Sequence, residues 1–580
     1  MRESSQKAKR LVRSYVRIGL IVTVLLGAVA FAGVASGQDL ENIGDQKPVS
    51  LDGSITFSGT KYSVAGANPR RPPTSWSIVG SPTLGIYGIT FPFTFIISDQ
   101  ESSTRQPFDQ FGVSPSYKWL TLHVGYQSLT YSKYTLAGIT FLGGGIDINP
   151  SPLRLSVMYG RFQRAVEVDT APPTSTYSYA QPAYKRMGLA VKAGYGSDAS
   201  FVDFIYLHAK DDSASLLRKP DSLNIFPTEN SVFALNTHVK IIDALALEGE
   251  VSASLLTRDV RSQKLDSTSI PSLVSSIVDV KSSSSLLLAA NAGIVLTLPH
   301  FSTRFSYERI EPDYNSLGAF YFTSDIENFL VAPSFDLFDN KFRVSGSVGI
   351  QNDNILSTRI AKTQRVIGSG NMSINPSQVF GLDLNYTNYS TSQGASKLPG
   401  DTGQYLVRNV SQSASVTPRL LFLSSETSNS FILSVSQQQY TDYNLYTQGF
   451  SNSLTTTGSF NYSLSLLKSG LNTGISLLYA TTKQGATNID LIGATLNASK
   501  SLLDNTLSLG GSFGITISNV RPIAYTSNTF SESINCSYRI LTHGTLSLNI
   551  YANETTSTSA GSIPFTEVTA TLSYSHNFSF

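Results

Sequence analysis

The sequence predicts an all-β protein, built as one large antiparallel transmembrane β-barrel of about 22 to 24 strands. Three observations lead to this prediction. Apolar residues alternate with polar ones along most of the chain, charged residues are scarce, and the predicted connections fall into two length classes. A period of two places alternate side chains on opposite faces of a strand. One face is therefore expected in an apolar medium and the other against water.

The alternation is clearest in the second half of the chain. Leucine, isoleucine and aromatic residues alternate with Ser, Thr, Asn and Gly at 471–479, 507–518 and 546–550. A hydrophobic core would not accept such a polar face, but a water-filled lumen would. No window after the N-terminal segment shows helical periodicity.

The composition agrees with this prediction. Charged residues make up 14% of the chain, against about 25% in soluble domains. The mean hydropathy is only −0.01, and the apolar residues are dispersed. A lipid-facing barrel has this composition because every second residue of its strands is polar.

The N-terminus predicts an export signal. Six Lys and Arg residues precede the uncharged stretch 18–37, which ends in Ala35-Ser36-Gly37. A basic region, an apolar run and small residues are typical of a cleaved signal peptide, here residues 1–37 with cleavage before Gln38. The alternative is a signal anchor that stays in the membrane.

Loss of the leader would change the net charge. It removes six of 42 Lys and Arg and one of 40 Asp and Glu, which leaves about −3. A nucleic-acid partner therefore has no electrostatic support. The single Cys536 cannot form an internal disulfide, and no metal-ligand or cofactor motif is present.

The connections predict the strand count. Long polar stretches, such as 169–182, 210–230, 257–282 and 440–451, separate pairs of strands joined by short turns. Ten short turns rich in Asn, Asp, Gly, Pro and Ser lie at 149–151, 196–198, 242–244, 299–300, 339–341, 375–377, 424–429, 468–470, 504–505 and 542–544. They and the flanking strands give about 22 strands, and residues 51–98 could add two. Short turns on one rim and long loops on the other are typical of such barrels.

Residues 38–118 are less regular than the barrel proper, which we expect at 119–580. They contain Asn68 to Pro73, Pro92 and Pro107. Proline within a strand pattern indicates an edge, a bulge or no strand. This segment is expected to hold either irregular first strands or a small lumen or periplasmic element.

The C-terminal stretch 565–580 carries a resemblance. Its even positions are largely apolar or aromatic and its odd positions are polar, and the even series is Val568, Ala570, Leu572, Tyr574, His576, Phe578 and Phe580. This ending resembles the C-terminal assembly signal of bacterial outer-membrane β-barrel proteins, carried here by Leu572, Tyr574, His576, Phe578 and Phe580. The resemblance implies insertion into the outer-membrane bilayer by the barrel assembly machinery, with even residues facing lipid.

A second resemblance lies between Ser81 and Val166. This stretch includes Pro107 to Gly112, Tyr117-Lys118-Trp119 and Tyr134 to Gly138. Its sequence resembles poorly characterised, porin-like outer-membrane proteins of Bacteroidota-type bacteria. It covers under a fifth of the chain. It implies a location rather than an activity.

Nothing in the sequence predicts an enzyme. The six His residues are scattered singly, and no metalloprotease helix motif, nucleophile elbow or phosphate-binding glycine loop is present. We therefore expect no catalytic, cofactor-binding or metal-binding residues.

A basic patch in the lumen is one possibility. Arg154 and His123 both have inward parity in their strands, so they could prefer anions. Lys118 joins them only if its strand starts later or bulges. The alternative is that these charges pair with inward carboxylates such as Asp147, or stay hydrated.

The expected function is a porin-like passive channel for small hydrophilic solutes, because such a barrel is wide enough for a lumen. A structural or interaction barrel without conductance and an exported soluble β-rich adhesin are the alternatives. The chain before the regular barrel is too short for the plug domain of energy-coupled transporters. The sequence does not predict the oligomeric state.

Overall fold

The computed structural model describes residues 47–99, 110–168, 181–265, 278–320, 323–359, 361–394, 407–522, 525–540, 542–558 and 563–580. The predicted leader lies outside the described residues. Within them the all-β prediction is confirmed, because 28 strand segments form one sheet. The segments are β1 Val49–Ala65, β2 Thr74–Gly80, β3 Thr83–Ile86, β4 Ile89–Ser98, β5 Gln110–Val113, β6 Ser116–Tyr117, β7 Leu120–Gln127, β8 Phe141–Ile148, β9 Leu153–Gln163, β10 Lys185–Ser197, β11 Ser200–Asp212, β12 Glu229–Ile242, β13 Leu245–Thr257, β14 Ser284–Leu298, β15 Phe301–Ile310, β16 Ile326–Leu337, β17 Phe342–Asp353, β18 Thr363–Ile374, β19 Phe380–Gln393, β20 Arg408–Leu423, β21 Thr427–Asp442, β22 Ser453–Leu466, β23 Leu471–Gln484, β24 Thr487–Leu502, β25 Leu507–Arg521, β26 Tyr525–Ile540, β27 Gly544–Ser557 and β28 Phe565–Ser579.

Helical structure is minor in the described residues. A 3-10 helix, η2, spans Asp221–Leu223, and a single helical turn, α3, spans Gln448–Ser451. In the described residues there is no helix with the length and apolar character needed to cross a bilayer.

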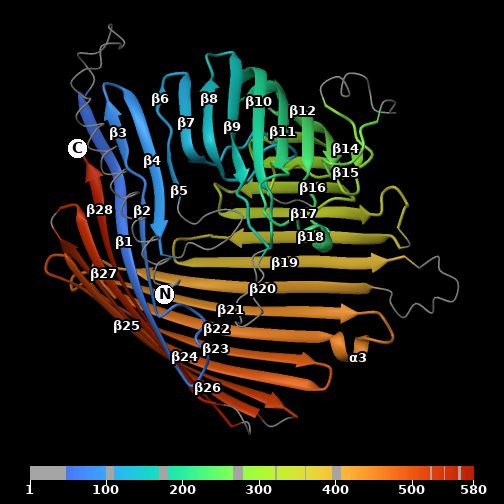
Figure 1. The fold of residues 1–580 in the computed structure, drawn as a ribbon. Helices are drawn as coiled ribbons and strands as arrows, with labels where there is room; N and C mark the ends of the chain where they lie inside the picture. The colour runs from blue at the N-terminus through green and yellow to red at the C-terminus, as the bar shows by residue number, and fades with distance from the viewer. Residues whose placement is uncertain are drawn as a thin grey trace.

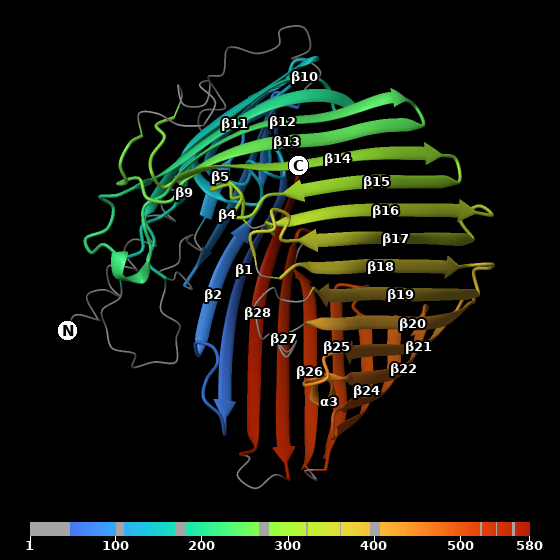
Figure 2. The ribbon, with the colours of Figure 1, turned by 90° about the vertical axis from the view of Figure 1, so that its right-hand side faces the viewer.

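The sheet closes on itself. Strand β28 pairs antiparallel with β1 from Asp52 opposite Ser579 to Ala65 opposite Thr566, and the two lie side by side in Figures 1 and 2. Strands β2 and β3 both pair with β1 and β4 in one unbroken register, and so do β5 and β6 with β4 and β7. Each of these pairs is one broken stave, meaning one crossing of the wall. The barrel therefore has 26 staves, and the expected 22 to 24 was too low.

Prolines explain the missing staves. Ser81-Pro82 separates β2 from β3, and Ser114-Pro115 separates β5 from β6. Proline has no N–H to give to the ladder, so each stave breaks there while its register continues. The breaks line up across neighbours through three backbone hydrogen bonds, Phe93 N to Pro82 O (2.8 Å), Ser114 N to Pro92 O (3.1 Å) and Leu122 N to Pro115 O (2.8 Å). Residues 49–117 thus contribute four staves to the same sheet.

The two rims differ as expected. All ten predicted short turns join consecutive strands, from β8–β9 to β26–β27. They lie on the rim, here called the turn side, where β1 begins and β28 ends. The opposite rim, the loop side, carries the longer connections, although β23 and β24 are joined there by only two residues.

The two faces of the wall separate by polarity. At the closing seam, β1 and β28 hydroxyls meet inside the barrel, Thr56 with Ser575 (3.0 Å), Ser58 with Ser573 (3.1 Å) and Thr60 with Thr571 (3.1 Å). The other face of the same strands pairs Phe57 with Tyr574. Around the wall, outward residues such as Val157, Leu235 and Ile534 are exposed. This apolar outer face is suited to lipid.

The interior is packed along only part of the wall. In the described residues, buried hydrophobic side chains occur from Tyr62 to Ile326 and none follows in β17 to β28. Inward residues of those later strands, such as Ser415, Ser459 and Ser533, are half-buried. A side chain facing a filled core would be buried, so we call β18 to β28 the open wall and β7 to β15 the filled wall.

Candidate functional site

Two loops of the barrel fill part of its lumen. They are residues 128–140, between β7 and β8, and 311–320, after β15, and we call them the plug loops. Backbone bonds join them, from Ala137 N to Gly318 O and from Phe320 N to Ala137 O, both at 3.0 Å. Ser316 Oγ donates to the Thr135 carbonyl at 2.5 Å. The plug loops therefore behave as one unit.

An apolar cluster holds this unit against the filled wall. Tyr131, Leu136 and Leu317 from the plug loops pack with the inward side chains of β8 to β12, which are Phe141, Met158, Phe162, Ala190, Ile205, Leu207, Ala209, Val232 and Ala234. The opposite faces of these strands carry the exposed apolar residues. The packing face is thus the lumen face.

Two wall carboxylates anchor the first plug loop. Glu250 of β13 is 4% exposed and accepts hydrogen bonds from Ser132 Oγ (2.6 Å) and Tyr134 N (3.2 Å). Glu308 of β15 accepts from Tyr134 Oη (2.5 Å) and forms an ion pair with Lys133. Buried carboxylates need such donors, because an unpaired buried charge is costly. The anchors therefore fix the loop at mid-wall.

The second plug loop has its own anchors on the same wall. Tyr314 Oη hydrogen-bonds Ser252 Oγ (2.7 Å) and donates to the Tyr134 carbonyl (3.0 Å). Leu317 N donates to Asn230 Oδ1 at 3.0 Å. The Tyr134 and Tyr314 rings meet edge to face at 6.2 Å. Both loops therefore share one polar and aromatic junction.

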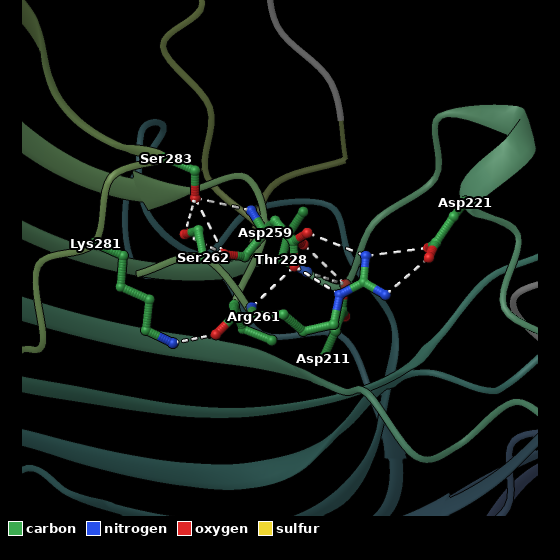
Figure 3. A network of polar contacts seen from close by, with 9 residues as sticks. Asp211, Asp221, Thr228, Asp259, Arg261, Ser262, Lys281 and Ser283 are labelled. Carbon is green, nitrogen blue, oxygen red and sulfur yellow. Dashed lines mark hydrogen bonds and ion pairs between the residues drawn. The ribbon is translucent and has the colours of Figure 1, made fainter. Parts of the chain in front are cut away.

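A polar network fastens the loop-side connections above the filled wall (Figure 3). The Arg261 guanidinium binds Asp221, from the β11–β12 loop, at 3.0 and 3.1 Å, and Asp259, from its own loop, at 2.9 and 3.0 Å. These hydrogen bonds from Arg261 hold the pKa of the Asp259 carboxyl below its usual value. Thr228 Oγ1 donates to Asp211 at 2.8 Å. The network ties the β13–β14 loop to the β11–β12 loop.

The residues of the expected basic patch lie apart. His123 Nε2 is 3.0 Å from Asp147 Oδ2, and Arg154 binds Asp203 at 3.0 Å and Asp198 at 2.8 Å. Each of these two side chains thus lies against a carboxylate, and no hydrogen bond or ion pair joins His123 to Arg154 in the described chain. Lys118 lies in the β6–β7 turn, with Nζ 5.3 Å from the centre of the Tyr117 ring. The basic patch therefore stays a prediction, and its three residues do not form one site.

The residues of the expected assembly signal lie on the last strand and at the chain end. Leu572, Tyr574 and His576 oppose Gly59, Phe57 and Ile55 of β1. Phe578 packs against the His576 ring at 4.8 Å, and the Phe580 backbone bonds Leu51 in both directions, at 3.0 and 3.2 Å. The closing role of β28 is therefore structural. Its recognition by assembly machinery stays a prediction.

The described residues contain no group of three or more His, Cys, Asp or Glu placed to hold a metal ion. The expectation that the chain is not an enzyme and uses no cofactor stays a prediction. The chemistry that the arrangement offers is hydrogen bonding to solutes along the open wall, beside a plug held by carboxylates.

Comparisons with known proteins find solved structures that are similar to this chain at low sequence identity. No family model and no curated protein matches the chain. The copper transporter OprC is 10% identical with a TM-score of 0.39, over 91% of this chain and 80% of that one. The translocation pore of the P pilus usher PapC is 9% identical with a TM-score of 0.35, over 91% and 99%. OccAB2 of Acinetobacter baumannii is 8% identical with a TM-score of 0.31, over 61% and 92%. At these values the matches carry no argument about function and identify no family.

The plug residues were not found by sequence reasoning. One signal was present in β13, where Glu248 and Glu250 share the parity of Ser252 and oppose Val251. Two acidic residues with inward parity in mid-strand mark a place where the wall meets a polar partner. The partner loop, 128–140, carries no pattern that places it inside the barrel.

Proposed function

We propose that this chain is a bacterial outer-membrane barrel, exported by a cleaved leader, that acts as a porin-like passive channel for small hydrophilic solutes. The observation that carries the proposal is the half-filled lumen. The plug loops pack on the filled wall, whereas inward Ser, Thr and Asn side chains of the open wall are not buried. A polar path beside a plug is what passive diffusion needs.

The exposed apolar outer face supports a membrane location. Outward residues such as Tyr159, Phe305 and Leu496 are each about half-exposed, and they belong to a band that continues around the closed sheet. A soluble adhesin would present this band to water, which soluble proteins avoid. The barrel assembly machinery and the outer-membrane bilayer are the partners that this proposal implies.

Planar-bilayer recording tests the channel. Purified protein that has been folded in detergent is added to a lipid bilayer in salt, and the same protein after heat denaturation is the control. We expect stepwise current increases from the folded protein only. Folded protein that inserts and stays silent would contradict the proposal.

N-terminal sequencing of protein from the membrane fraction tests the export part separately. Mature chains are expected to begin at Gln38. Chains that retain residues 1–37 would support a signal anchor instead.

A second candidate is an interaction barrel, and one observation favours it. The β21–β22 loop exposes Leu445 (82%) and Phe450 (81%) at the loop side. Asp442 ties the two ends of this loop together by accepting hydrogen bonds from Asn444 N (2.8 Å) and Ser451 Oγ (2.6 Å). An exposed apolar tip held in this way is suited to a partner. Co-purification of a stoichiometric partner that is lost in Leu445→Ser/Phe450→Ser, from a barrel without conductance, would support this candidate.

A further inference from the structure

The open wall is free of charge at mid-depth. Its inward residues on β20 to β28 are mostly Ser, Thr and Asn, among them Ser413, Ser415, Thr417, Ser434, Thr457, Ser459, Asn461, Ser476, Thr495, Asn497, Ser512, Thr529, Ser531, Ser533, Asn535 and Asn549. Among the described residues, six with inward parity in the open wall, β18 to β28, are charged, and each lies towards a strand end: Arg365, Asp383, Arg419, Asp442, Arg539 and Glu567. A solute passing mid-wall therefore meets no ionised side chain there.

The hydroxyls of this wall retain hydrogen-bonding capacity. Several are paired across strands, Ser512 with Ser533 (2.7 Å), Thr455 with Thr482 (3.0 Å) and Thr417 with Ser434 (3.1 Å). A hydroxyl has one donor and two acceptor sites, so each pair uses one donor and one acceptor and leaves others facing the lumen. These groups match the hydroxyls of a solute.

The charges of the filled wall, which faces the open wall across the lumen, largely neutralise one another. Lys133 pairs with Glu308 in the plug, and Arg304 pairs with Glu248. Arg154 pairs with Asp203 at 3.0 Å, as described above. Opposite charges in contact leave a weak field beyond a Debye length, about 10 Å at 0.1 M salt. The filled wall therefore gives ions of either sign little advantage.

We propose that the lumen selects uncharged, hydroxyl-bearing solutes, such as sugars and other polyols, over charged solutes of similar size. This inference rests on the proposed channel function and adds the class of solute to it. The open wall offers hydrogen bonds that replace part of the hydration of a polyol. At mid-depth it offers no fixed opposite charge to offset the desolvation of a charged group.

The test combines two measurements on the full chain in lipid. Swelling of proteoliposomes compares a neutral hexose with the corresponding sugar acid and amino sugar. Reversal potentials in a gradient of KCl give the ratio of cation to anion permeability. The KCl concentration is kept near about 0.1 M, because salt at that concentration does not fully screen charges on the wall. We expect fastest swelling in the neutral sugar and a permeability ratio within about twofold of one.

Matched variants locate the effect on the open wall. Ser533→Asp is expected to make the channel prefer cations, and Ser533→Lys to make it prefer anions, because the side chain of Ser533 faces the lumen at mid-strand. Ser469→Asp, in an exposed turn between β22 and β23, is the control and should leave the ratio unchanged.

The outcomes separate the two claims. A conducting wild-type channel that swells faster in a charged sugar, or that is strongly ion-selective, overturns this inference and leaves the channel standing. A ratio of cation to anion permeability that is unchanged in both Ser533 variants also overturns it. An absence of both current and swelling overturns the channel function itself.

Discussion

Gly318 shows how closely the plug loops meet the wall. A Cβ at this position would lie 2.5 Å from Leu207 Cδ1 and 2.9 Å from the Thr135 carbonyl oxygen. Leu207 is fully buried in β11, and Thr135 belongs to the other plug loop. A larger residue therefore has to push the two plug loops apart or off the wall.

Gly318→Val is expected to lower the free energy of unfolding by about 1–3 kcal/mol, as overpacking does elsewhere. Chemical unfolding in detergent, followed by tryptophan fluorescence, measures the change. Gly458→Ala is the control, because a Cβ at Gly458 has no heavy atom within 4 Å. Equal stability of both variants and the wild type would show that the plug loops are not packed as described.

Glu532 is an outward carboxylate at mid-wall. It is exposed, and it opposes Phe513 of β25 and Ala552 of β27. Its position is the eighth of the 16 residues of β26. On a lipid-facing surface a charge is most costly at this depth.

Glu532→Gln is expected to stabilise the barrel by about 1 kcal/mol in lipid. The comparison is Glu554→Gln, on the same face of β27 but near its loop-side end, where the gain should be smaller. Urea unfolding in lipid vesicles gives both values. A loss of stability in Glu532→Gln, or an equal gain in both variants, would show that this face does not meet lipid as described.

Strand and turn positions were largely predictable, because local residue chemistry determines them. The turn at Asp504-Asn505 and the strands beside it follow from Asn, Asp and a period of two. The number of staves in the segment 49–117 was underestimated, since Pro82 and Pro115 lie inside staves whose register continues past them. Long-range pairing with β1, β4 and β7 overrides the local proline signal there, and no local pattern reports such pairing.

The loop network on the loop side has a pH dependence. Since bonds from Arg261 depress the pKa of Asp259 in the folded chain, the stabilisation is present above the ordinary pKa of an Asp. It is lost as pH falls through the depressed value. The β13–β14 loop is therefore expected to loosen in acid.

Limited proteolysis with an acid-active protease, from neutral pH down to about pH 3, measures this loosening. Cleavage in the β13–β14 loop should increase on acidification. Arg261→Gln should be cleaved readily at every pH in the range, whereas Lys468→Gln, in a turn at the opposite rim, should resemble the wild type. A wild-type loop that is equally resistant at both ends of the range would contradict this role of Arg261.

At the scale of the whole molecule, the barrel is asymmetric in what fills it. One side of the wall carries the plug loops, and the other presents hydroxyls to the lumen. The number of staves makes this possible, because a barrel of 26 staves is far wider than the eight-stranded barrels that side chains alone can fill. The channel proposal and its solute class both depend on this asymmetry.

Thiol accessibility tests the asymmetry most directly. In a Cys536→Ser background, a single cysteine is placed either on the open wall, as Ser415→Cys, or behind the plug, as Ser252→Cys. A charged, membrane-impermeant thiol reagent is then added to the folded protein in lipid vesicles. Ser252 is fully buried and Ser415 is half-buried, so the Ser252→Cys variant should react at least about tenfold more slowly. Equal rates, or faster reaction behind the plug, would contradict a lumen that is filled on one side and open on the other.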